Sequence, residues 1–423
     1  MKKIFAVGFA AAMAVAGSSA FGAGFGIYEA SSRGNGMAGA LVGGTGDATA
    51  VYYNPAALTD VTNVSVSAGV TFINPFCDVT VNHQPQTKMN SGWFTAPNFY
   101  LSVPLTDRIV VGYGNYSEFG LGTKYGQHWA MAGDTIDTTI IQYTFNPVLA
   151  VKLTDWWSVA AGARISYIDF ENHKRPMWGP SAGVLTANAK SRLHGDDINA
   201  GWLVANNFKI TDKLKLGVMY RSRINHVIKG DFNVNGGIYS PLGLAVPMYA
   251  HSPAKAKLTL PQSLTVGLNY DITDDWRVGV TAMAIGWRSV DKINFKIPAV
   301  VAGQKAGYVQ KLNWKDTFRL GFGTEYDIND WLTARCGYTY DQDPTTEKYG
   351  TTMLPSGDRH IVHTGLGFNL AEGLRLDVGY SLVLMERGSR YITVKDLTDG
   401  TRYHFDCRNS YSHLVSAQLT YNF

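Results

Sequence analysis

The sequence is short of charge and cysteine, and it lacks long apolar runs. Of its 423 residues only 17% are charged and 3 are cysteine, and the net charge is +4. A balance this mild argues against a nucleic-acid partner. The apolar stretch at residues 4–16 is too short to cross a bilayer as a helix, and no run of about 18 apolar residues follows it. The 10 histidines are scattered without paired metal-ligand spacing, so we expect no metal site and no cofactor.

Glycine and aromatic residues are abundant instead, with 45 Gly, 23 Tyr and 10 Trp. The chain begins with two lysines, the apolar stretch and then small residues, which is typical of a signal peptide over residues 1–22. We expect cleavage before Ala23, with cleavage after Ala20 as the alternative. Export combined with this composition predicts an outer-membrane β-barrel. The alternative at this point is a secreted soluble β-sandwich array or propeller.

The last stretch, SHLVSAQLTYNF (412–423), alternates strictly between apolar and small polar residues. An apolar face opposite a polar one suits a strand between lipid and a wet lumen. The final residue, Phe423, resembles the signal read by the barrel-assembly machinery, which we therefore expect as a partner during biogenesis. The same alternation recurs at 263–270, 362–369 and 374–382.

Short polar turns separate these segments, and Asp and Asn favour such turns because their side chains bond to nearby backbone. They lie at 105–108, 153–157, 210–214, 272–276, 328–331 and 371–373. The other connections are long, at about 75–93, 173–195, 235–255, 297–312, 342–357 and 391–408. Six turns and two end strands predict an all-β, antiparallel transmembrane barrel of about 14 strands. The even number places both termini in the periplasm.

Residues 23–60 precede the first strand, which we expect to begin near Val64. This segment, which includes TGDATAVYYNPAAL (45–58), is too polar and glycine-rich to span a membrane. A barrel this wide leaks unless something fills it, so we predict that the segment is a plug inside the lumen of a barrel formed by 61–423. The alternative is a disordered periplasmic leader.

Several stretches resemble the FadL/TodX family of outer-membrane transporters for long-chain fatty acids and other hydrophobic compounds. The most specific are AGFGIYEASSRGNGMAGA (23–40) and NPAAL (54–58), which contains Asn54, Pro55 and Ala56. The remaining ones are NYSEFGLGTKY (115–125), MYRSRINHVIKGDF (219–232), LTLPQSLTVGL (258–268) and KDTFRLGFGTEY (315–326). The resemblance implies an N-terminal hatch in the lumen, ligand capture between outer loops, and passive sideways exit through a kinked third strand.

The kinked strand would be 109–125 in this chain. The residues that match its irregular part are Asn115, Tyr116, Gly120 and Gly122. Glycine weakens a strand and favours bulges, as an opening requires. The alternative is that these glycines only turn a barrel corner.

A fatty acid needs an apolar slot for its tail and a cation for its carboxylate. The resemblance places basic ligand contacts at Lys174, Arg175 and Lys311. Each has the alternative of contacting lipopolysaccharide phosphate. Near the mature N-terminus, Phe25, Ile27 and Tyr28 are candidates to line an inner pocket or, alternatively, to pack the plug.

Lumen-facing charges are predicted to form a network that holds the plug. Strand alternation points four arginines and two acids inward: Arg164, Arg319, Arg335, Arg375, Glu325 and Asp377. We expect Glu29 and Asp47 of the plug to join them.

Two of the three cysteines, Cys77 and Cys407, fall at the outer ends of the first and last strands, which are neighbours in a closed barrel. We predict that they approach closely and form a disulfide, with two free loop thiols as the alternative. Cys336 shares the alternation of lipid-facing residues. His360 and His363 should face opposite sides, so this close pair does not form a hydrolytic site.

Together these patterns predict a monomeric outer-membrane barrel, in contact with lipid and lipopolysaccharide, for passive uptake of long-chain fatty acids. The alternatives are uptake of other hydrophobic compounds such as aromatic hydrocarbons, a general porin, or a surface adhesin. We do not expect an enzyme.

Overall fold

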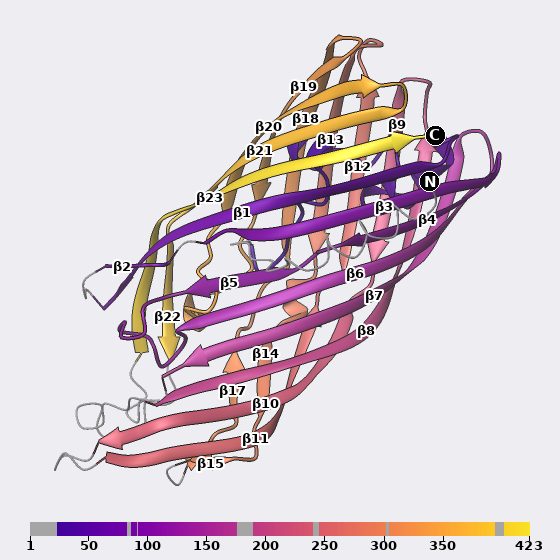
Figure 1. The fold of residues 1–423 in the computed structure, drawn as a ribbon. Coiled ribbons are helices and arrows are strands. Elements are labelled where there is room, and N and C mark those ends of the chain that lie inside the picture. Colours follow the sequence, from indigo (N-terminus) through magenta and orange to yellow (C-terminus); the bar gives the residue numbers. More distant parts are fainter. Residues whose placement is uncertain are drawn as a thin grey trace.

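The computed structural model is a closed antiparallel barrel of 14 strands, as the alternation predicts (Figure 1). It describes residues 23–82, 86–90, 92–175, 189–239, 245–301, 304–393 and 402–423. The barrel closes where the first strand pairs with the last, from Ser65 opposite Asn422 to Val81 opposite Phe405. The wall consists of β1 (Ser65–Val81), β3 (Phe94–Thr106), β4 (Ile109–Tyr116), β5 (Gly120–Lys124), β6 (Asp137–Lys152), β7 (Trp157–Lys174), β8 (Lys190–Lys209), β9 (Leu214–Arg221), β10 (Ile224–Tyr239), β11 (Ala245–Leu260), β12 (Ser263–Asp271), β13 (Trp276–Ile285), β14 (Lys292–Lys296), β17 (Tyr308–Lys311), β18 (Thr317–Asn329), β19 (Leu332–Asp341), β20 (Arg359–Ala371), β21 (Leu374–Met385), β22 (Gly388–Thr393) and β23 (Arg402–Asn422).

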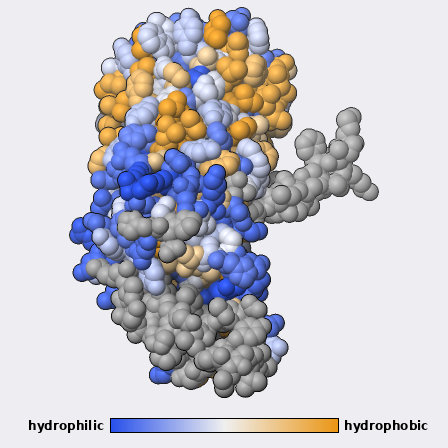
Figure 2. Space-filling model, turned by 90° about the vertical axis from the view of Figure 1, so that its left-hand side faces the viewer, coloured by the Kyte–Doolittle hydropathy of each residue, from blue (hydrophilic) through white to orange (hydrophobic). Residues whose placement is uncertain are grey.

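Side chains alternate between the outside and the lumen along each wall strand. In β18, Phe318, Leu320 and Phe322 are exposed while Arg319 and Gly321 between them are buried. Figure 2 shows the outward apolar side chains gathered on one half of the barrel, whereas the half that carries the long loops is hydrophilic. An apolar outer band and a polar interior are what a membrane barrel requires.

The six short turns lie where the sequence predicts them. Trp156, Trp276 and Trp331, beside three of these turns, are exposed, as residues of an interfacial aromatic belt are. The prediction of long loops is partly wrong, because β1 continues to Val81 and the β10–β11 hairpin fills much of 235–255. Strands extend beyond the apolar band because the ladder hydrogen bonds, not the lipid, hold them together. Short elements on this side are β2 (Thr87–Lys88), β15 (Val300–Val301), β16 (Gln304–Lys305), η2 (Trp287–Ser289) and η3 (Glu347–Tyr349).

The N-terminal segment, residues 23–61, lies inside the barrel and is mostly buried. It forms α2 (Ser32–Gly36), α3 (Ala50–Tyr53) and η1 (Pro55–Asp60). α2 contacts β19, β20, β21, β23 and β1, and η1 contacts β4, β6, β7 and β8, so the segment reaches opposite parts of the wall. Among the described residues, no helix is long and apolar enough to cross a membrane. The predicted signal peptide lies outside the described residues.

Six of the 14 strands are interrupted and carry two labels each: β4/β5, β9/β10, β11/β12, β13/β14, β17/β18 and β21/β22. Two of these interruptions adjoin the buried charged residues Glu118 and Arg221. β4 ends at Tyr116 and β5 begins at Gly120, and within the described chain β5 pairs only with β6, so β3 and β5 are not bonded to each other. The second interruption separates β9, ending at Arg221, from β10, beginning at Ile224. The predicted irregularity of 109–125 therefore corresponds to a break in the ladder.

Candidate ligand pathway and its charge networks

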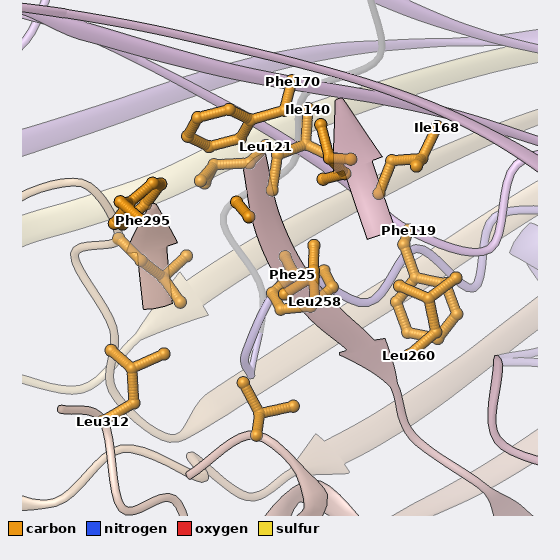
Figure 3. Close-up of a cluster of buried hydrophobic side chains, with 14 of the residues drawn as sticks. Phe25, Phe119, Leu121, Ile140, Ile168, Phe170, Leu258, Leu260, Phe295 and Leu312 are labelled. Atoms are coloured by element: carbon orange, nitrogen blue, oxygen red, sulfur yellow. The ribbon is translucent and has the colours of Figure 1, made fainter. Parts of the chain in front are cut away.

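Apolar side chains from many strands meet inside the barrel and form a buried group, called here the lumen cluster (Figure 3). At its inner end, the ring of Phe25 lies 5.6 Å from that of Phe119 and 5.1 Å from that of Trp287. At its outer end, the rings of Phe170 and Phe295 lie 6.1 Å apart. The cluster also contains Leu121, Ile140, Ile168, Leu193, Ile224, Ile228, Phe232, Leu258, Leu260, Leu312 and Trp314. It offers an apolar surface within a mostly polar lumen.

A cation stands at the outer end of the lumen cluster. Nζ of Lys174 lies 2.6 Å from the hydroxyl of Tyr308 and 4.4 Å from the centre of its ring. The Tyr308 ring in turn stacks on Phe295 at 4.6 Å. These two rings also line a groove of about 420 Å³, together with Lys296 and Lys305. The groove thus combines an apolar floor with several positive charges.

Of the three predicted basic contacts, Lys174 is the one that contacts a lining residue of this groove, Tyr308. The guanidinium of Arg175 lies 2.7 Å from Nδ1 of His128, in another loop. Lys311 is exposed and lies on the opposite face of β17 from Tyr308, because neighbouring strand residues alternate. Tyr308 could not be predicted from the sequence, because it lies in a short strand without clear alternation.

The three predicted N-terminal residues separate in the structure. Phe25 belongs to the lumen cluster, and Tyr28 packs against it while its ring faces the guanidinium of Arg319 at 4.6 Å. Ile27 joins a smaller apolar group that includes Ile73. All three side chains thus face the interior.

The N-terminal segment also bonds to the wall at the break between β4 and β5. The N–H of Gly120 donates to the carbonyl of Phe25 at 2.9 Å, and the N–H of Ile27 donates to the carbonyl of Glu118 at 2.8 Å. Residues 25–27 therefore satisfy backbone groups that a continuous ladder would satisfy.

The other predicted residues of the break face the neighbouring strand β6. Tyr116 donates its hydroxyl to Oδ1 of Asn146 at 2.8 Å, and Nδ2 of Asn115 donates to the carbonyl of Thr144 at 3.3 Å. Gly122 pairs with Thr139 of β6. On this side of the break, β6 is therefore bonded both to β4 and to β5, while residues 117–119 lie outside the ladder.

The Asn-Pro-Ala triplet fixes the second half of the N-terminal segment. Asn54 donates from Nδ2 to the carbonyls of Val42, at 2.8 Å, and of Asn206 in β8, at 3.0 Å. Its Oδ1 accepts from the N–H of Ala56 at 3.1 Å and so caps η1, in which Pro55 is the first residue. Ala56 is completely buried, so a larger side chain would not fit there.

A chain of ion pairs joins the N-terminal segment to the far wall. Glu325 accepts two hydrogen bonds from Arg33, both 2.9 Å, one from Arg277 at 2.9 Å and one from Arg335 at 2.5 Å. Nη1 of Arg335 also lies 2.8 Å from a carboxylate oxygen of Asp377, which Arg375 approaches at 3.1 Å. Four of the predicted residues meet here. Arg33 and Arg277 were not predicted, because each lies in the first two residues of an element, where alternation gives little guidance.

The two remaining arginines have partners that strand alternation does not indicate. Arg164 pairs with Glu118 at 2.5 Å, and Arg319 lies 3.6 Å from Asp341. The predicted partners in the plug behave differently: Asp47 lies 3.8 Å from Arg33, whereas Glu29 accepts a bond from the N–H of Tyr28. Glu118 was detectable in principle, since it is an acid within the glycine-rich stretch NYSEFGLG.

Cys77 and Cys407 meet at the barrel seam. Cys407 pairs with Val79 in the β1–β23 ladder, and its side chain belongs to the same buried apolar group as that of Cys77. Both thiols are buried and free in this structure, whereas Cys336 is exposed on the outer face of β19. The structure thus brings the predicted pair together without a bond between them. The two histidines that were predicted to face opposite sides of the wall differ in burial, since His360 is partly exposed and His363 is buried.

Comparison with known proteins identifies the family. Residues 13–423 match the family described as "Outer membrane protein transport protein (OMPP1/FadL/TodX)". The chain belongs to this family. A long-chain fatty acid transport protein of Escherichia coli is 25% identical, with 88% of this chain and 89% of that protein covered. Members are outer-membrane transporters or channels rather than enzymes, and this chain is an outer-membrane transporter of hydrophobic compounds.

Solved structures of the family share the fold. A FadL homologue of Pseudomonas aeruginosa superimposes with a TM-score of 0.83 at 21% identity, covering 95% of this chain and 100% of that one. The toluene transporter TodX of Pseudomonas putida gives a TM-score of 0.72 at 19% identity, covering 95% and 99%. The 14-stranded architecture is therefore that of the family.

Proposed function

We propose that this protein takes up long-chain fatty acids passively across the outer membrane. The ligand binds in the outer groove, where Lys174 attracts its carboxylate, and the tail follows the lumen cluster inward. The observation that supports this proposal is a continuous buried apolar cluster with a cation at its outer end. Burial of the tail favours entry by about 0.8 kcal/mol for each methylene group.

In this proposal the N-terminal segment acts as a hatch, and the ligand leaves sideways between β3 and β5. The segment fills the lumen beneath the cluster and is anchored through Arg33 and Asn54. At the break, the backbone of Gly120 is bonded to Phe25 of the N-terminal segment, and the backbone of Glu118 is bonded to Ile27. Diffusion into the membrane through this break needs no energy source.

A second candidate is uptake of uncharged aromatic compounds. The inner end of the lumen cluster is made of aromatic rings, with Trp287 and Trp314 5.2 Å apart beside Phe25. The TodX structure is that of a toluene transporter. An aromatic hydrocarbon would use these rings and would have no need of Lys174.

Binding of oleate and of toluene to the purified protein, measured by tryptophan fluorescence, tests the two candidates. We expect Lys174→Met to weaken oleate binding about tenfold, because a charge-assisted contact contributes roughly 1.5 kcal/mol or more, and to leave toluene binding unchanged. Lys292→Met is the control, since its ammonium is exposed and, among the residues that the structure describes, pairs only with Asp291 at 3.3 Å. Saturable binding of toluene alone would favour the second candidate, and saturable binding of neither would favour a porin or an adhesin.

A further inference from the structure

Glu118 lies in the break between β4 and β5, and its carboxylate is buried between two arginines. Oε2 lies 2.5 Å from Nη2 of Arg164 and accepts the hydroxyl of Thr144 at 2.9 Å. Oε1 lies 3.4 Å from Nε of Arg221. No more than 6% of any of the three charged residues is exposed, so solvent screens these contacts little.

The same residue joins the wall break to the N-terminal segment. The carbonyl of Glu118 accepts from Ile27, and its N–H donates to Oε1 of Gln142 in β6 at 2.9 Å. Arg164 also donates to the carbonyl of Ser222 at 2.7 Å, in the second interruption of the wall. The Glu118 side chain is thus the polar side-chain anchor of the residues between β4 and β5, whose other hydrogen bonds among the described residues are made by their backbone.

The site has more positive than negative charge. Two guanidinium groups face one carboxylate, and Nε of Arg164 has no hydrogen-bond partner among the described residues. Both arginines and Glu118 line a cavity together with Phe119, which also belongs to the lumen cluster. The cluster therefore leads directly to this site.

The cavity is about 20 Å³ in volume, close to the space that one water molecule needs. A second carboxylate fits between Arg164 and Arg221 only if the Glu118 carboxylate leaves. Such an exchange replaces one anion by another, so the buried arginines stay paired. An uncharged ligand cannot make the exchange, because it would leave both guanidinium groups without a counter-ion.

We propose that Glu118 occupies the place of the ligand carboxylate and is a displaceable latch on the lateral break. This inference rests on the proposed uptake of fatty acids. A carboxylate arriving along the lumen cluster takes over the contacts with Arg164 and Arg221. The residues between β4 and β5 then lose their side-chain anchor and are held only by backbone bonds to Ile27 and Gln142. Passage through the break is thereby coupled to the head group of the ligand.

Glu118→Gln tests the latch, because it keeps the shape of the side chain and removes the competing anion. We expect this variant to bind oleate at least tenfold more tightly than the wild type and to bind methyl oleate as the wild type does. Glu171→Gln is the matched control, since that carboxylate is partly exposed on β7 and pairs with Arg192. It should change neither affinity.

A folded Glu118→Gln protein that binds oleate no more tightly than the wild type would show that Glu118 is only a structural ion-pair partner. Folding is checked by heat-modifiable migration in gels. Thr144→Val provides a second test that leaves every charge in place and removes one donor to Glu118. We expect it to tighten oleate binding a few-fold, and unchanged or weaker binding would contradict the latch. If the wild type does not bind oleate, both the proposed fatty-acid function and the latch are rejected. If the wild type binds oleate but Glu118→Gln binds it no more tightly, only the latch is rejected.

Discussion

Replacing Arg33 with methionine removes the main charged contact of the N-terminal segment with the wall. Arg33 makes two hydrogen bonds of 2.9 Å to Glu325 and one to the carbonyl of Thr45. Each bond to a charged group contributes about 1.5–3 kcal/mol. Glu325 keeps Arg277 and Arg335 as partners in the variant, so we take the lower end, about 3 kcal/mol for the two bonds.

A loss of about 3 kcal/mol raises the undocked fraction of the segment roughly 100-fold, because 1.4 kcal/mol corresponds to a factor of ten. If the segment closes the lumen, undocking opens an aqueous path. We therefore expect Arg33→Met to show frequent ion-conducting openings in planar lipid bilayers. We also expect faster proteolysis within residues 23–61 while the barrel stays intact.

The matched control is Arg288→Met, which removes the same charge from the hydrophilic surface. Arg288 lies 3.6 Å from Asp316, and both side chains are at least half exposed. Such a pair contributes about 0–1 kcal/mol, so conductance should match the wild type. Wild-type conductance together with wild-type proteolysis in Arg33→Met would refute the reasoning, because the ion pair would then not hold the segment in place.

Three further predictions test the hatch and the seam. Deleting residues 24–58 should give a steadily open, ion-conducting barrel, whereas unchanged conductance would support a porin that needs no hatch. A methyl group at Gly217 would lie 2.0 Å from a backbone oxygen of the N-terminal segment, so Gly217→Ala should raise conductance, whereas Gly126→Ala, with nothing within 4 Å, should not. The third test uses a variant in which Cys336 is replaced by serine. Treatment with an oxidised dithiol should join Cys77 and Cys407 by disulfide exchange and so protect them from maleimide until a reductant is added. Continued labelling by maleimide would rule out the bridge.

The wall was the part of this protein that its sequence predicted best. A strand with lipid on one side and a polar lumen on the other must alternate, and the alternation at 412–423 carries into a continuous β23. The positions of the turns could be predicted from their Asp and Asn residues. The extensions of β10 and β11 beyond the membrane could not be predicted, because no lipid imposes an apolar face on them.

The charge contacts were harder to predict, because they depend on distances across the barrel. Alternation showed that Arg164 faces the lumen, but its partner Glu118 is 46 residues away and lies where the ladder breaks. The face that Lys311 presents is hard to predict for a related reason, since a short strand at a loop edge can present either face. Sequence periodicity indicates which side of the wall a residue takes, and the tilt and register of the strands decide which residues it meets there.

The distribution of apolar and charged residues inside the barrel favours a sideways exit. Below the lumen cluster, a ligand moving straight through the lumen would have to separate Arg33 from Glu325, which costs about 3 kcal/mol for the two hydrogen bonds. At the break, the backbone bonds from Gly120 to Phe25 and from Ile27 to Glu118 stand in the way, at about 1 kcal/mol net each. The one charged obstacle there is the Glu118 carboxylate, which a fatty acid can replace with its own head group. If the protein takes up fatty acids as proposed, we therefore expect an apolar tail with a carboxylate to meet its lowest barrier through the wall.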